Sequence, residues 1–205
     1  MFSDSYATET FARLVKDYSV RTVVETGTYR GDSTIRFLDF VNDVITMDIL
    51  PMCVGWTAGR LSEQGFVLED DTFPKPLPGK FLYMRKNDKR VRLYVGNSPE
   101  IIRSIIERLS EPLLFFLDAH WFNYWPLKDE IRAIKPRPNS VIIVHDILVP
   151  GKDFGFDRYA DQPCDYNLIR EDLNYVNNIY KIYYNKEAAG EYRGILYAVP
   201  PRGEK

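Results

Sequence analysis

Cysteine and histidine are scarce in this chain of 205 residues, which has two of each. Cys53 and Cys164 form no CxxC pair and are too few for a disulfide framework, so we expect reduced thiols with a structural role. A run of 18 apolar residues, as a membrane-spanning helix needs, is also missing. The N-terminus lacks the basic-then-apolar layout of a signal peptide, and we therefore expect a cytoplasmic protein without membrane insertion.

An excess of charge of one sign is absent as well. The chain has 27 Lys and Arg residues against 29 Asp and Glu residues, a net charge of −2. This balance favours neither nucleic acid nor an acidic membrane as a partner, and a small-molecule ligand fits it better. With 45% hydrophobic residues the chain can bury one sizeable core, so we expect a single domain over residues 1–205.

Both histidines stand beside an aspartate at the end of an apolar run. His120 closes the run LLFFLDAH, and His145 precedes Asp146 in SVIIVHD. Such runs are typical of buried parallel strands, and ligands of open α/β sheets bind where these strands end. The sequence therefore predicts a functional site at two strand ends.

The rest of the chain alternates between strand and helix patterns. Apolar spacing and capping residues predict helices, and β-branched runs predict strands. Helices are expected near residues 4–17, 33–41, 99–109, 126–134 and 166–177; strands near 21–27, 44–49, 91–98, 112–120 and 141–147; and a closing hairpin at 179–185 and 192–200. This order predicts an α/β fold with a doubly wound, mostly parallel sheet and an antiparallel finish.

Two segments interrupt this alternation. Residues 51–90 begin with one or two short helices near 53–65 and continue as a long excursion, for which we expect a lid or an oligomer contact, with a homodimer as one outcome. Residues 151–165 are polar and aromatic, and we expect them to form a substrate loop.

The first strand leads into the loop Glu25-Thr26-Gly27-Thr28-Tyr29-Arg30-Gly31. This loop lacks the middle glycine of a dinucleotide-binding GxGxxG motif, which disfavours a dinucleotide oxidoreductase. Its acid suits an ammonium or sulfonium group, and S-adenosylmethionine carries both. Asp48, at the end of the second strand, can take both hydroxyls of a ribose. The alternative is that the glycines only make a tight turn and both acids are solvated strand ends.

Five segments in this order resemble the class I S-adenosylmethionine-dependent methyltransferases. They are VVETGTYRGDSTIRF, TMDI, VGNSPEII, FLDAHW and IIVHDI. The chain is most similar to the divalent-metal-dependent O-methyltransferases of the catechol and antibiotic-sugar types, and loosely similar to virus- or bacterium-encoded glycan O-methyltransferases, which would act in the host cytoplasm if viral. The likeness covers residues 8–150, except 51–90. It implies a Rossmann-like, seven-stranded sheet with helices on both faces.

The resemblance also implies a set of cofactor contacts. Those around the methionine part, the ribose and the adenine of S-adenosylmethionine are Glu25, Gly27, Thr28, Tyr29, Gly31, Ser33, Asp48, Gly96, Asn97, Ser98, Asp118 and Trp121. Asp118 is expected at the cofactor amine and Trp121 on the adenine face. For Tyr29 and Trp121 the alternative role is that of a core aromatic.

Two neighbouring strand ends place the carboxylates of Asp118 and Asp146 close together, where a divalent cation would remove their repulsion. The resembling enzymes have an acid pair or an Asp-Asn pair at the second strand end; here the pair is His145-Asp146, followed by Ile147. We expect Asp118, His145 and Asp146 to bind Mg²⁺ or Mn²⁺. A hydrogen-bonded, non-ligating His145 is the alternative.

The catalytic residues are expected to be His120 and Asp118. Catechol-type enzymes have a lysine where this chain has Trp121, and His120 replaces it as the base that takes the hydroxyl proton, with Lys128 as second choice. The acceptor should lie under residues 121–126 and 151–165. These segments hold the aromatic residues Trp121, Tyr124, Trp125, Phe154, Phe156 and Tyr159 and the aspartates Asp153, Asp157 and Asp161. Such side chains suit a sugar or glycan hydroxyl, although the acids can equally be loop solvation.

Three functions therefore remain open. The favoured one is a metal-assisted O-methyltransferase of a sugar or glycan. The second is a metal-independent methyltransferase of a small phenol or polyketide with His120 as base. The third is a non-catalytic protein that only binds the cofactor.

Overall fold

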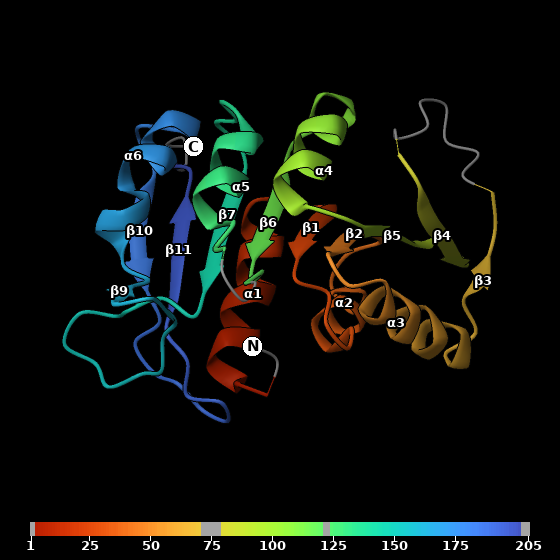
Figure 1. The fold of residues 1–205 in the computed structure, drawn as a ribbon, viewed down its shortest axis with the longest axis horizontal. Coiled ribbons are helices and arrows are strands. Elements are labelled where there is room, and N and C mark those ends of the chain that lie inside the picture. The colour runs from red at the N-terminus through yellow and green to blue at the C-terminus, as the bar shows by residue number, and fades with distance from the viewer. Residues whose placement is uncertain (1–2, 71–78, 121–123, 202–205) are drawn as a thin grey trace.

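The structure is a computed structural model that describes residues 3–70, 79–120 and 124–201. Its centre is one nine-stranded sheet in the order β10-β11-β7-β6-β1-β2-β5-β4-β3 (Figure 1). The strands are β1 (Thr22–Thr26), β2 (Asp43–Asp48), β3 (Val67–Leu68), β4 (Phe81–Lys86), β5 (Lys89–Val95), β6 (Leu113–Leu117), β7 (Val141–His145), β10 (Lys181–Tyr184) and β11 (Ile195–Val199). A separate pair, β8 (Arg158–Tyr159) and β9 (Gln162–Pro163), lies in the expected substrate loop.

Helices cover both faces of the sheet (Figure 1). One core forms under α1 (Ser5–Asp17), α2 (Asp32–Phe37) and α3 (Pro51–Glu63). The other forms under α4 (Ser98–Ile105), α5 (Leu127–Ile134) and α6 (Tyr166–Val176). A 3₁₀ turn, Ile106–Arg108, extends α4.

The strand directions confirm the predicted fold class. Strands β1, β2, β5, β6 and β7 are mutually parallel, and β10 and β11 form the antiparallel hairpin at the end of the chain. Strand β11 pairs antiparallel with β7. A doubly wound, mostly parallel sheet with a C-terminal antiparallel hairpin is therefore present.

The sheet is longer than the seven strands that the resemblance implied. The excursion begins with one helix, α3, whose Pro51 stands in its first turn, and then adds β3 and β4 as antiparallel strands on the free edge of β5. Backbone pairing along β4 satisfies the polar groups that an open edge of β5 would leave unpaired. The expectation of a lid or oligomer contact falls partly on residues 71–78, which lie outside the described residues.

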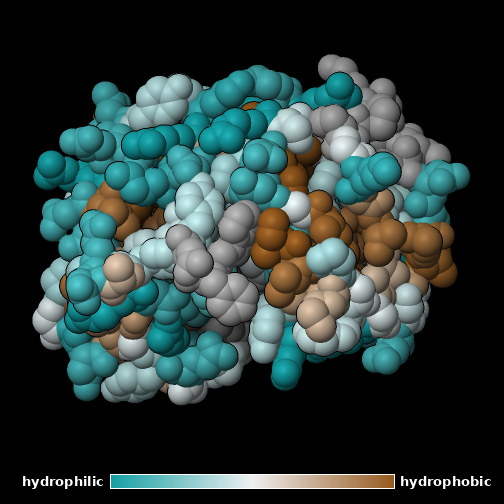
Figure 2. All heavy atoms as spheres, viewed as in Figure 1, coloured by the Kyte–Doolittle hydropathy of each residue, from teal (hydrophilic) through white to brown (hydrophobic). Residues whose placement is uncertain are grey.

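Apolar side chains gather at this added edge. Figure 2 shows hydrophobic residues over the β5–β4–β3 end of the molecule, in contrast to the hydrophilic opposite end. Val67 and Leu68 of β3 and Val95 of β5 are among the exposed large hydrophobic residues. No helix in the described part of the chain has the length and hydropathy to cross a membrane.

The register of the parallel strands aligns their carboxyl ends. Thr26 of β1 lies opposite Met47 of β2 and Leu117 of β6, and Leu117 lies opposite Val144 of β7. The residues that follow these positions therefore share one edge of the sheet, at the point where the chain reverses its winding direction around β1. Open α/β sheets bind their ligands at such a position.

Candidate functional site

A cavity of 1530 Å³ opens at this edge of the sheet. It brings together most of the residues that the sequence predicted. Those that line it are Gly27, Thr28, Tyr29, Ser33, Asp48, Gly96, Ser98, Asp118, His120, His145 and Asp146. Glu25, Gly31 and Asn97 are not on its wall, and Trp121 lies outside the described residues.

The two glycines of the first loop have different tasks. Gly27 has a φ of +82°, and a Cβ there would lie 2.7 Å from the carbonyl oxygen of Asp118. Only glycine permits this approach, which joins the ends of β1 and β6 under the cavity. Gly31 begins α2 at a φ of +76°, and a Cβ there would lie 2.5 Å from Thr57 of α3. Gly31 thus serves helix packing.

Asp48 is held by backbone donors. Its Oδ2 accepts a hydrogen bond from the amide of Tyr29 at 2.8 Å, and its Oδ1 accepts one from the amide of Leu50 at 2.9 Å. Each carboxylate oxygen keeps lone pairs for further donors. Tyr29 has a φ of +46° and an exposed ring, so this aromatic does not belong to the core. A carboxylate fixed at the cavity rim can receive two vicinal hydroxyls.

Glu25 lies beneath the cavity, with 0% of its surface exposed. Its carboxyl group accepts hydrogen bonds from the hydroxyls of Ser33, Thr34 and Thr46. Burial raises the pKa of Glu25 to about 7, although the three hydroxyl donors act in the opposite direction. Glu25 therefore orients Ser33, which does line the cavity, and has no surface for direct contact with a ligand.

The start of α4 forms another wall. Gly96 has a φ of +147° and donates its amide hydrogen to the carbonyl oxygen of Asp48 at 2.9 Å. Asn97 has a buried Oδ1 without a hydrogen-bond partner among the described residues. Ser98 donates its hydroxyl to Oε1 of Glu130, which is fully buried. Burial raises the pKa of Glu130 to about 8, which keeps this carboxyl neutral at pH 7.

Glu130 was not predicted from the sequence, although its position in the apolar pattern of α5 indicates a buried role. In α5 it stands on the face that Leu127, Ile131 and Ile134 bury. A glutamate at an apolar position of an amphipathic helix indicates a buried polar contact.

Asp118, His145 and Asp146 form the cluster that the sequence assigned to a metal. The Nδ1 atom of His145 lies 3.1 Å from Oδ1 of Asp118 and 2.9 Å from Oδ1 of Asp146. Burial lowers the pKa of His145, but the two carboxylates outweigh it and raise the pKa to about 10. One oxygen or nitrogen atom of each residue lies within 4.8 Å of the others. The set of two oxygens and one nitrogen suits Mn²⁺ or Mg²⁺ in its donor chemistry.

Arg193, which the sequence reasoning missed, binds two acids of this cavity. Its Nε donates to Oδ1 of Asp146 at 2.5 Å, and its Nη2 donates to Oδ1 of Asp157. The cavity wall includes both Arg193 and Asp157. An arginine just before a strand carries no sequence signal of such a role, because its partners stand 47 and 36 residues away in the chain.

His120 is the most accessible ionisable group at the strand ends. Its side chain is 61% exposed, and its Nδ1 lies 3.7 Å from Oδ2 of Asp157. Lys128, the second choice for a base, is not on the cavity wall. Among the three aspartates expected around the acceptor, Asp157 lines the cavity, whereas Asp153 and Asp161 do not.

Aromatic side chains complete the side of the cavity next to His120. The rings of Trp125 and Tyr159 stack at a centroid distance of 6.1 Å and an angle of 14°. Phe156 lies beside them on the wall, with the guanidinium of Arg158 over its ring at 5.0 Å. Phe154, also expected here, is buried against Tyr192 instead.

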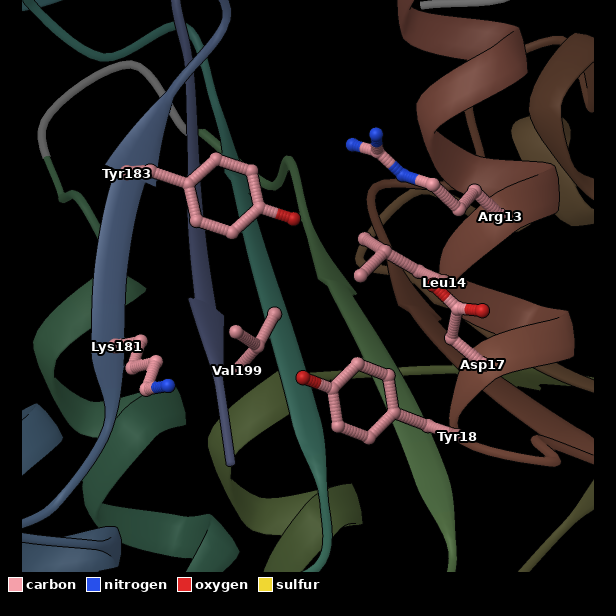
Figure 3. A pocket seen from close by; sticks show the side chains of 7 residues that line it. All are labelled: Arg13, Leu14, Asp17, Tyr18, Lys181, Tyr183 and Val199. Atoms are coloured by element: carbon pink, nitrogen blue, oxygen red, sulfur yellow. The ribbon is translucent and has the colours of Figure 1, made fainter. Parts of the chain in front are cut away.

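A second cavity, of 430 Å³, lies between α1 and the hairpin of β10 and β11 (Figure 3). Its walls are formed by Arg13, Leu14, Asp17, Tyr18, Lys181, Tyr183 and Val199. None of these is a predicted site residue. The larger cavity, at the strand ends, is therefore the candidate functional site.

Comparisons with known proteins bear on the fold of this chain. No family model and no curated protein matches the chain. Among solved structures, precorrin 8w decarboxylase of Methanobacterium thermoautotrophicum aligns with a TM-score of 0.55 at 15% identity, over 94% of this chain and 90% of that one. The chain has the class I methyltransferase fold.

Two further structures of this fold carry related compounds. An O-methyltransferase from Bacillus cereus, in complex with SAH, has a TM-score of 0.53 at 15% identity over 95% of this chain and 81% of that one. TomG from Streptomyces achromogenes, an O-methyltransferase of tomaymycin synthesis in complex with SAM, has the same TM-score and identity over 94% and 79%. At this identity the likeness establishes the class I methyltransferase fold and not the acceptor.

Proposed function

We propose that this protein is an S-adenosylmethionine-dependent O-methyltransferase. One observation supports it above the others: Gly27, Asp48 and Asp118, from three separate strand ends of a class I methyltransferase fold, converge on one cavity. When bound, S-adenosylmethionine supplies an electrophilic methyl group on a sulfonium. The backbone approach at Gly27 and the oriented carboxylate of Asp48 both fit a ligand with hydroxyl, amine and adenine groups.

Within this proposal the residues divide the work by position. Asp48 binds the ribose hydroxyls, and Gly96 with Asn97 and Ser98 borders the adenine. Tyr29 and Ser33 border the methionine part, where the Asp118 carboxylate attracts the amine. For Trp121, which lies outside the described residues, we propose the adenine face, as the resemblance implied. Glu25 and Gly31 support these residues from below.

His120 is the proposed base. In methyl transfer the acceptor oxygen forms a bond to the methyl carbon while the carbon–sulfur bond breaks and its electron pair stays on sulfur. The hydroxyl proton must leave, and the exposed imidazole of His120, on the acceptor side of Asp118, can take it.

Asp118, His145 and Asp146 would hold a divalent cation in the favoured form of this proposal. With Mg²⁺ or Mn²⁺ held by these residues, an acceptor hydroxyl would become more acidic. The donor atoms support it, because two carboxylate oxygens and an imidazole nitrogen lie close enough for one ion.

A metal-independent transfer is the second candidate, and Arg193 favours it. The guanidinium already neutralises Asp146, and the His145 imidazole lies between both carboxylates. The repulsion that predicts a metal is therefore compensated by protein charges. In this metal-independent form of the reaction His120 removes the hydroxyl proton without help from a metal ion, and a small phenol or polyketide fits the aromatic wall.

We propose a sugar or glycan hydroxyl as the acceptor. The stacked pair of Trp125 and Tyr159 offers an aromatic face to the apolar side of a sugar ring, and Asp157 offers a carboxylate oxygen near the same wall.

The deciding experiment has two stages. Calorimetry with S-adenosylhomocysteine tests the cofactor site: the wild type should bind it, and Asp48→Ala should bind it at least tenfold more weakly. Transfer of a labelled methyl group to a panel of sugars and phenols then tests the reaction. Loss of turnover in EDTA and its return with Mn²⁺ selects the metal-assisted form, whereas unchanged turnover selects the metal-independent one. Cofactor binding without transfer to any acceptor would leave the non-catalytic binding protein.

A further inference from the structure

A continuous chain of ionisable side chains crosses the part of the cavity next to His120, which we call the acceptor half. From His120 the contacts run to Asp157, from Asp157 to Arg193, and from Arg193 to Asp146. Arg193 stands in the middle, between a strand end and the segment of residues 151–165, which we call the acceptor loop. The guanidinium therefore ties two parts of the chain together.

Backbone hydrogen bonds reinforce the same tie. Gly155 of the acceptor loop donates to the carbonyl oxygen of Tyr192 at 2.8 Å, and Gly194 donates to the carbonyl oxygen of Gly155 at 2.9 Å. The amide of Asp157 donates to the carbonyl oxygen of Asp146 at 2.8 Å. Asp157 is thus fixed through both its main chain and its side chain.

Close packing specifies where the Arg193 side chain lies. A Cβ on Gly155 would lie 3.0 Å from Nη1 of Arg193, and a Cβ on Gly194 would collide with the carbonyl oxygen of Ile147. Asp146 adopts a φ of +60°, a strained conformation for a residue with a side chain. The absence of a side chain at Gly155 and Gly194 and the positive φ of Asp146 therefore allow the acceptor loop, the end of β7 and Arg193 to pack in contact.

The outcome is a carboxylate aimed at the base. Arg193 occupies Oδ1 of Asp157, while Oδ2 faces Nδ1 of His120 at 3.7 Å. This distance lies within the range of an ion pair and is longer than a hydrogen bond. A carboxylate at Nδ1 keeps the proton there and leaves Nε2 free to accept one.

We propose that Asp157 orients His120 and that Arg193 holds Asp157 in place, so that the catalytic base is completed by the acceptor loop. This inference rests on the proposed methyl transfer and deepens it. Asp157 and Arg193 are positioning residues: the acceptor hydroxyl gives its proton to Nε2 of His120, and the Asp157 carboxylate stabilises the imidazolium that forms.

The first test is spectroscopic and needs no acceptor. The chain has only two histidines, so long-range ¹H–¹⁵N correlations of their rings are readily assigned. With its ring neutral, His120 should carry its proton on Nδ1 in the wild type, and D157N and R193Q should shift the proton toward Nε2. Lys152→Gln, an exposed position of the same loop outside the cavity wall, is the matched control. An unchanged tautomer in D157N would overturn the proposal.

The second test is kinetic. We expect D157N and R193Q each to lower kcat by about 10- to 100-fold with the affinity for S-adenosylhomocysteine unchanged. In a His120→Ala background D157N should lower kcat no further, since Asp157 acts through His120. An equal loss in both backgrounds would assign Asp157 a purely structural role. A wild type without methyl transfer would refute the proposed function instead, and the tautomer measurement would still decide the positioning role.

Discussion

The cavity holds its carboxylates in different ways in the proposed cofactor half, around Asp48, and in the proposed acceptor half, around Asp146 and Asp157. Asp48 is oriented by the backbone amides of Tyr29 and Leu50, 19 and 2 residues away. Asp146 and Asp157 are oriented by Arg193, 47 and 36 residues away. Backbone donors cannot be mutated away, whereas a single substitution removes a guanidinium. The cofactor half should therefore tolerate side-chain changes around it, and the acceptor half should not.

The largest expected effect is on the acceptor half. His120→Ala and Asp118→Ala should each lower the methyl-transfer rate by at least about a hundredfold, because the first removes the base and the second a charge beside the reacting groups. Single-turnover rates at saturating cofactor provide the measurement. A near-normal rate in His120→Ala would exclude this residue as the base.

The next largest effect is expected at Gly27, where the two halves of the cavity meet, and it concerns the stability of the fold. Gly27→Ala should reduce the free energy of unfolding by about 2–3 kcal/mol. The backbone at this position has a positive φ, which alanine disfavours, and the new Cβ would lie too close to the carbonyl oxygen of Asp118. Gly55→Ala, in the middle of α3, is the matched control, because a Cβ at this position would meet no atom within 4 Å. This substitution should stabilise the helix by about 0.5–1 kcal/mol. Urea unfolding compares them; equal effects would refute the close approach.

A smaller effect is expected in the cofactor half, where a substitution of Asp48 should change the affinity for the cofactor and leave the rate of transfer nearly unchanged. Asp48→Ala should weaken S-adenosylhomocysteine binding by about 10- to 30-fold through two lost charged hydrogen bonds. Its kcat at saturating cofactor should stay within about threefold of the wild type, because in the proposed function Asp48 binds the ribose and contacts neither the base nor the acceptor. Calorimetry and kinetics measure the two quantities. Asp88→Asn, at an exposed position between β4 and β5, is the control. A fall in kcat alone would contradict the assignment to the ribose.

The last prediction concerns pH and Glu130, and its effect builds up only over several pH units. Its folded pKa of about 8 exceeds the ordinary value of 4.5, so its contribution to stability is fully present below pH 4.5 and is lost as pH rises toward 8. Between these limits wild-type stability should fall relative to Glu130→Gln by at most about 1.4 kcal/mol per pH unit. Urea unfolding of both proteins at several pH values measures this difference. Parallel stability curves would show that Glu130 is ionised in the fold.

The secondary-structure elements and the convergence of the residues around Asp48 on one cavity were largely predictable from the sequence. Apolar periodicity and β-branched runs placed the parallel strands β1, β2, β5, β6 and β7, because these patterns reflect local burial. The glycine loop and Asp48 followed from short-range spacing at two of those strand ends. The added strands β3 and β4 were not predicted, since their pairing depends on the free edge of β5, a property of the assembled sheet.

The acceptor half was predictable only in part. Asp118, His120, His145 and Asp146 stood out because they lie at the ends of two apolar strands. The roles of these groups depend on neighbours that the sequence does not mark. His145 was the uncertain member, and the structure buries it between two carboxylates, where its pKa rises. Phe154, expected at the acceptor, turned out to be buried.

The sequence by itself determined which residues reach the carboxyl ends of the strands, because strand length, alternation and turn residues are encoded within a few positions of each other. Only the tertiary structure decided how the charges there are compensated. Arg193 meets Asp146 and Asp157 through the antiparallel return of β11 beside β7 and the fold of the acceptor loop. Electrostatic pairing acts through space, over separations in the chain that no local pattern records.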